Sequence, residues 1–78
     1  MEDRLQTARR LLDHDDQLSY EVREELWEDL QYVMSDPKAD LVPAKRKLIQ
    51  INLAKAGEVV RESIIEIIAR TTAEFLRG

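Results

Sequence analysis

Apolar residues recur most regularly in the last third of the chain, at the spacing of an α-helix. One face of the corresponding helical wheel collects Val60, Ile64, Ile67, Ile68, Thr71 and Phe75. Ile65, Thr72 and Leu76 widen this face to about half the circumference, which is broader than the apolar stripe of an ordinary surface helix. Such a helix needs cover from more than one partner, from its own chain or from another.

Three earlier segments also show helical periodicity. Together with the last one, they predict helices over residues 2–12, 20–34, 43–56 and 58–76. Ser19 is a suitable N-cap for the second helix and Asp40 for the third, in whose first turn Pro43 is tolerated. Acidic and amide residues between the first two helices favour local side-chain to backbone bonds and predict a linker. We therefore predict one all-α domain over residues 1–78, a small bundle of three to four helices with a long, broadly amphipathic C-terminal helix.

The last two predicted helices meet at Gly57, and the sequence leaves two alternatives there. Ile49, Leu53 and Val60 keep the same helical phase across this position, and one glycine inside a helix costs only about 1 kcal/mol relative to alanine. A continuous or kinked helix is therefore favoured over two helices that break at the glycine. It would be about 50 Å long at a rise of 1.5 Å per residue, too long for the first two helices to cover alone.

Charge and composition narrow the function classes. The chain has 12 basic and 16 acidic residues and a net charge of −4, which disfavours nucleic-acid binding because phosphates require a basic surface. The absence of cysteine suits a reducing compartment and provides neither disulfides nor thiolate metal ligands. No segment approaches the roughly 18 to 20 continuous apolar residues that span a bilayer, and the N-terminus lacks a signal-peptide apolar stretch. We expect a cytoplasmic protein without a membrane partner.

The broad apolar face of the last helix is the predicted partner-binding site. Its candidate residues are Val60, Arg61, Ile64, Ile65, Ile68, Thr72 and Phe75. Arg61 intrudes on the apolar face, where its stem can pack while the guanidinium reaches solvent. The alternative is a bidentate pair with a carboxylate, within the chain or across an interface.

A possible secondary contact is the basic cluster Lys45, Arg46 and Lys47, which could meet a phosphate or an acidic partner. Trp27 could anchor either the core or an interface.

The acidic linker raises the question of a metal site. The spacing of a calcium-binding loop is partly matched by Asp13, Asp15, Gln17, Ser19, Glu21 and Glu24. Leu18 stands where that loop needs glycine, so a plain interhelical linker is the favoured interpretation. His14, the single histidine, is weak support for a metal site on its own. We predict no metal and no cofactor.

The sequence contains no nucleophile–base pair and no phosphate-binding loop, so we predict a protein that is not an enzyme. The favoured function is a small regulatory or adaptor module for protein–protein interaction or self-association, with a homodimer as the simplest assembly. The alternative is a small nucleic-acid-associated regulator that uses Lys45, Arg46 and Lys47.

Overall fold

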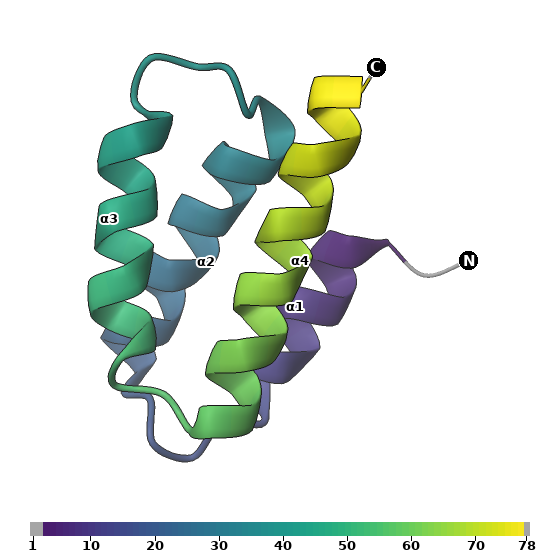
Figure 1. The fold of residues 1–78 in the computed structure, drawn as a ribbon. Coiled ribbons are helices and arrows are strands. Elements are labelled where there is room, and N and C mark those ends of the chain that lie inside the picture. Colours follow the sequence, from purple (N-terminus) through teal and green to yellow (C-terminus); the bar gives the residue numbers. More distant parts are fainter. Residues whose placement is uncertain (1–2, 78) are drawn as a thin grey trace.

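Four helices alternate in direction along the chain (Figure 1). In the computed structural model, the backbone is described for residues 3–77 and the side chains for residues 3–73. The helices are α1 (Arg4–Asp13), α2 (Tyr20–Ser35), α3 (Val42–Leu53) and α4 (Glu58–Arg77). The part of the chain that the structure describes contains no strand. The predicted all-α bundle is confirmed.

Local hydrogen bonds explain where the first helices begin. The Asp3 carboxylate accepts a bond from the Leu5 N–H at 3.1 Å and caps α1. The Ser19 hydroxyl accepts one from the Val22 N–H at 3.3 Å, as expected for the N-cap of α2.

The start of α3 differs from the prediction, because Asp40 does not cap it. Leu41 occupies the N-cap position without a side-chain bond, and Pro43 lies in the first turn. Two backbone turns, closed by the Ala39 and Val42 N–H groups, lead directly into the helix and leave no extended residue to act as a cap.

The predicted continuous helix across Gly57 is wrong. α3 ends at Leu53 and α4 begins at Glu58. The Lys55 N–H bonds three residues back, to the Asn52 carbonyl at 3.0 Å. This tighter turn ends the α-helical pattern.

A bond from a distant part of the chain holds the turn between α3 and α4. The Gly57 N–H donates to the Asp15 carboxylate at 2.7 Å and so joins the α3–α4 turn to the α1–α2 loop. Ile49 and Ile64 share a helical phase although they lie on two separate helices. α3 and α4 are antiparallel, and each turns its apolar face towards the same core.

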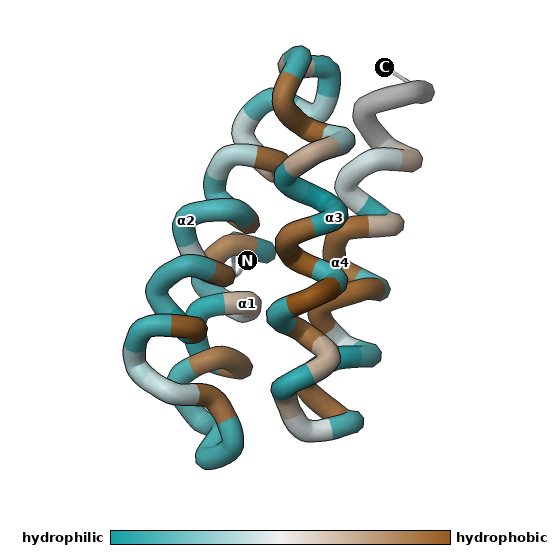
Figure 2. The backbone as a smooth tube through the Cα atoms, turned by 90° about the vertical axis from the view of Figure 1, so that its left-hand side faces the viewer, coloured by the Kyte–Doolittle hydropathy of each residue, from teal (hydrophilic) through white to brown (hydrophobic). Residues whose placement is uncertain are grey.

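The core is made of apolar side chains from all four helices and the intervening loops. It consists of Ala8, Leu12, Leu18, Leu26, Leu30, Val33, Val42, Ile49, Leu53, Ala56, Ile64 and Ile68. α3 packs mainly against α2, whereas α4 packs against α1 and α2. Figure 2 shows hydrophobic segments recurring along α3 and α4, and a largely hydrophilic outer side on α2.

A buried ion pair connects α2 to α3. Asp29 is only 3% exposed, and its Oδ1 lies 3.2 Å from the Lys45 Nζ. The Lys45 ammonium also lies 5.8 Å from the centre of the Tyr32 ring. The other carboxylate oxygen of Asp29 has no hydrogen-bond partner in the described part of the chain. Asp29 therefore depends on Lys45 for compensation of its charge.

Candidate functional site

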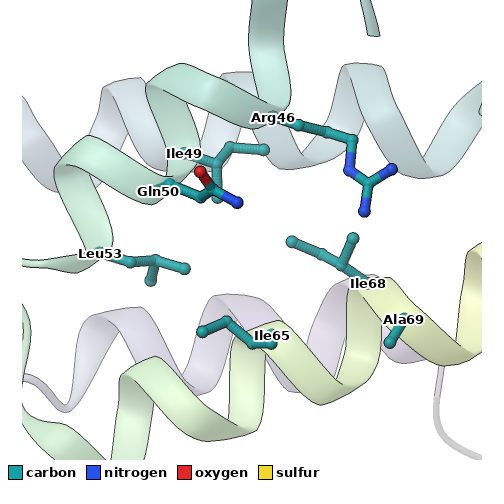
Figure 3. Close-up of a pocket in the computed structure, with 7 residues that line it drawn as sticks. All are labelled: Arg46, Ile49, Gln50, Leu53, Ile65, Ile68 and Ala69. Atoms are coloured by element: carbon teal, nitrogen blue, oxygen red, sulfur yellow. The ribbon is translucent and has the colours of Figure 1, made fainter. Parts of the chain in front are cut away.

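An open groove separates α3 from α4, because α3 packs on α2 and makes little contact with α4. The side chains that line it are Arg46, Ile49, Gln50, Leu53, Ile65, Ile68 and Ala69 (Figure 3). Its volume is about 100 Å³. Pockets for drug-sized ligands have roughly 300 to 1,000 Å³, whereas an apolar cavity of about 150 Å³ accepts benzene. The groove is therefore too small for a drug-sized ligand and is closer in size to a single apolar side chain.

Helical spacing brings the groove residues together. α3 contributes Arg46, Ile49, Gln50 and Leu53, which share one side of the helix because they are linked by steps of three and four residues. Ile49, Leu53 and Ile68 form an apolar floor that is continuous with the core. Ile65 stands on the wall of the groove and is 50% exposed, and Gln50 faces it from α3 in Figure 3.

The structure separates the predicted partner-binding residues into different environments. Ile64 is fully buried in the core, at 0% exposure. Ile65 and Ile68 line the groove. Val60, Arg61 and Thr72 are half-buried. The Phe75 side chain lies outside the described residues.

The secondary residues do not form one surface. Lys45 turns towards Asp29, Arg46 reaches into the groove, and Lys47 is exposed elsewhere on α3. Consecutive residues point about 100° apart around a helix, so a run of three basic residues is spread over different sides.

Trp27 lies away from the groove, on α2, where the Arg9 guanidinium carbon is 5.4 Å from the ring centre. The Arg9 guanidinium also donates to the Glu24 carboxylate at 2.8 Å. This hydrogen bond lowers the pKa of Glu24 below its ordinary value and raises the pKa of Arg9. Trp27 and its charged neighbours thus join α1 to α2.

The acidic linker serves the fold. The Asp15 carboxylate accepts bonds from the Gln17 and Gly57 N–H groups, both at 2.7 Å, and is almost buried. Among the described residues, no group of three or more histidine, cysteine, aspartate or glutamate side chains could hold a metal ion. Within the same part of the chain, no helix is long and apolar enough to cross a membrane.

A second depression lies between α1 and α4. It is larger, about 370 Å³, and is lined by Arg4, Thr7, Leu11, Ser63, Glu66, Ile67 and Arg70. Its charged residues already have partners within the chain. Arg70 pairs with Glu66 at 2.7 Å, and Arg4 donates to the Thr71 hydroxyl at 3.4 Å. The groove between α3 and α4 is the stronger candidate, because no described side chain covers its exposed apolar wall at Ile65.

The sequence interpretation missed the contribution of α3 to this site. Ile49, Gln50, Leu53 and Ala69 become site residues only when the chain reverses direction before Gly57. The glycine was the one available signal for that reversal.

Comparisons with protein-family models, with curated proteins and with solved structures found no match for this chain. The function of the groove therefore has to follow from the chemistry of its own residues.

Proposed function

We propose that the protein is a non-catalytic interaction module that receives an apolar side chain of a protein partner between α3 and α4. The observation that carries this proposal is the half-exposed Ile65 above a floor of core residues. Burial of apolar surface contributes about 25 cal/mol per Å². Burial of a partner side chain between the two walls would therefore stabilise the complex.

The groove has the anatomy of a protein-binding hot spot. Such sites combine a desolvated apolar centre with a polar rim, and here Arg46 and Gln50 border the apolar floor. The alternative role in nucleic-acid binding has less support. Lys45 is engaged with Asp29, which leaves the basic cluster with fewer available charges.

Site-specific photo-crosslinking tests the proposal. A photoreactive residue replaces Ala69 in the groove, and the same residue replaces Ala54, an exposed position outside it, as the control. In extract from the native host, the groove position should give a discrete protein adduct that the control position does not give. Ile65→Asp should abolish the adduct, whereas Ile51→Asp, at a residue 55% exposed outside the groove, should preserve it.

The same experiment can contradict the proposal. If Ala69 and Ala54 give the same adducts, or if Ile65→Asp changes neither adduct, the groove is not a protein-binding site.

A further inference from the structure

Among the described residues, Arg46 lines the groove, Arg61 lies next to it on α4, and neither side chain has a partner within the chain. Arg46 extends over one end of it towards Ile68 (Figure 3). Arg61 lies one helical turn before Ile65 on the same side of α4. Neither guanidinium makes an ion pair or hydrogen bond within the described part of the chain.

Every other arginine with a described side chain interacts within the chain. The Arg9 guanidinium pairs with Glu24, that of Arg70 pairs with Glu66, and that of Arg23 donates to two loop carbonyls. Arg4 and Arg10 also have partners. Arg46 and Arg61 are thus the two arginines without a partner among the described side chains, and both lie at or next to the groove.

The antiparallel arrangement places these two charges at opposite ends of the groove. Arg46 lies in the first half of α3 and so faces the later part of α4, near Ala69. Arg61 lies near the start of α4, beside the end of α3 at Leu53. Along α4 the levels of Arg61 and Ala69 are about 12 Å apart, or roughly two helical turns, at a rise of 1.5 Å per residue.

We propose that the partner segment is an acidic amphipathic helix, with an apolar side chain between carboxylates two turns apart. The apolar side chain would enter the groove beside Ile65, and the carboxylates would meet Arg46 and Arg61. Guanidinium groups favour bidentate pairing with carboxylates, and a helix in a groove is a common mode of peptide recognition. This inference rests on the proposed function and adds the chemistry of the partner.

Other occupants fit these charges less well. A single phosphate offers no apolar group to cover the floor of the groove. An acidic partner pairs with both guanidinium groups, and the attraction speeds the encounter.

Binding of synthetic helical peptides tests the proposal. The probe is a labelled, alanine-rich peptide with the pattern Glu-x-x-Leu-x-x-x-Glu, and its twin has both glutamates replaced by lysine. We expect the glutamate peptide to bind at least about tenfold more tightly at low salt, since two exposed ion pairs of about 0.7 kcal/mol each give this factor. Fluorescence anisotropy measures both affinities.

Charge reversal provides the matched variants. Arg46→Glu with Arg61→Glu should reverse the preference, and the neutral pair Arg46→Gln with Arg61→Gln should remove it. Lys47→Glu, the same change at an exposed residue next to Arg46, should leave the preference intact. Circular dichroism of each variant should show unchanged helix content.

The outcomes separate the two proposals. If both peptides bind equally and Ile65→Asp abolishes both, the acidic-helix proposal is wrong and the interaction groove stands. Absence of binding by the glutamate peptide overturns the acidic-helix proposal, and crosslinking at Ala69 then decides separately on the groove. An Ala69 adduct that is a second copy of the chain also overturns the acidic-helix proposal and supports self-association.

Discussion

At the residue scale, the Asp15 carboxylate shows how a charged group can be stable in a small core. Asp15 is 5% exposed, and its two oxygens accept bonds from the Gln17 and Gly57 N–H groups. Bonds from backbone N–H groups to a carboxylate are charge-assisted and stronger than neutral ones. Asp15 therefore stabilises two loops at once.

Asp15→Ala should lower the free energy of unfolding by about 2 to 3 kcal/mol, because it leaves two backbone donors without their charged acceptor. Urea denaturation measures the change. Asp16→Ala is the matched control at an exposed neighbouring residue and should change stability by less than about 0.5 kcal/mol. Equal effects of the two substitutions would contradict the role of Asp15.

Glu24 should make the stability depend on pH. Its pKa in the folded protein is lowered by the hydrogen bond from Arg9, so the unfolded chain takes up the proton first as the pH falls. The stabilisation is complete above the ordinary glutamate pKa of 4.5 and is lost below it, as the pH passes through the folded pKa. Glu24→Gln should therefore melt at a lower temperature than the unchanged protein at neutral pH, and the difference should close in acid.

Thermal unfolding followed over a series of pH values measures this effect. Glu25→Gln is the control, at an exposed residue next to Glu24. A difference between Glu24→Gln and the unchanged protein that stays constant down to the lowest pH would show that the pair does not contribute through its charge.

At the scale of the helix, the sequence predicted the elements better than their connections. The apolar spacing located all four helices, and Ser19 was correctly identified as a cap. The turn at Gly57 was missed because its decisive bond comes from Asp15, a residue 42 positions away. A helical wheel shows only the residues of one segment and cannot reveal a contact with a distant one. The helical phase alone does not distinguish one long helix from two helices that share a core.

The candidate site was predictable only in part, for the same reason. Ile65 and Ile68 were recognised from the width of the apolar face. The wheel could not separate them from Ile64, which the chain itself covers. Arg46 was noticed as part of a basic run, but its place opposite α4 follows from the chain reversal.

Gly57→Ala tests whether the glycine itself ends α3. Gly57 has no positive φ angle, and an added Cβ would lie 3.6 Å from the Asp15 carboxylate, at ordinary contact distance. Alanine restricts the unfolded chain, which raises the free energy of unfolding by about 0.4 to 1 kcal/mol. At the position before a helix, alanine lowers the free energy of unfolding relative to glycine by a similar amount. We therefore expect a change in unfolding free energy within about 0.5 kcal/mol.

Helix content and molecular mass of the Gly57→Ala variant should also stay unchanged, by circular dichroism and light scattering. A rise in both would mean that α3 and α4 fuse into one long helix in this variant and that the glycine, rather than Asp15, determines the turn.

Substitutions in the Asp29–Lys45 pair test how much this ion pair between α2 and α3 contributes to stability. Lys45→Met should lower the unfolding free energy by about 2 kcal/mol, because it leaves the buried Asp29 carboxylate without its cation. This magnitude is below the usual range for buried pairs, since the Lys45 side chain is itself 33% exposed. Adding Asp29→Leu should recover most of the loss, and Lys47→Met, at an exposed residue, should have little effect. A double variant as unstable as Lys45→Met would contradict this explanation.

At the scale of the whole molecule, a small core gives only a small free energy of unfolding. A domain of 78 residues has a typical stability of about 4 to 12 kcal/mol, at 0.05 to 0.15 kcal/mol per residue. Two adjacent isoleucines of α4 lie in different environments, one in this core and one on the wall of the groove. Ile64 is completely buried, whereas half of the Ile65 side chain is exposed.

Substitution of these neighbours should therefore have unequal effects. Ile64→Ala should cost about 2 to 5 kcal/mol, through lost burial and the cavity that remains, whereas Ile65→Ala should cost less than about 1 kcal/mol. Urea denaturation of both variants measures the difference. Similar losses would show that the groove wall belongs to the core and is not available to a partner.

The bond between Asp15 and Gly57 also makes one backbone proton a reporter of the whole fold. The Gly57 N–H can exchange with solvent deuterium only after it separates from a carboxylate in the first quarter of the chain. Opening of the α3–α4 turn thus requires the loss of a contact with the α1–α2 loop. The exchange rate of this single amide consequently measures how often the α1–α2 loop and the α3–α4 turn separate.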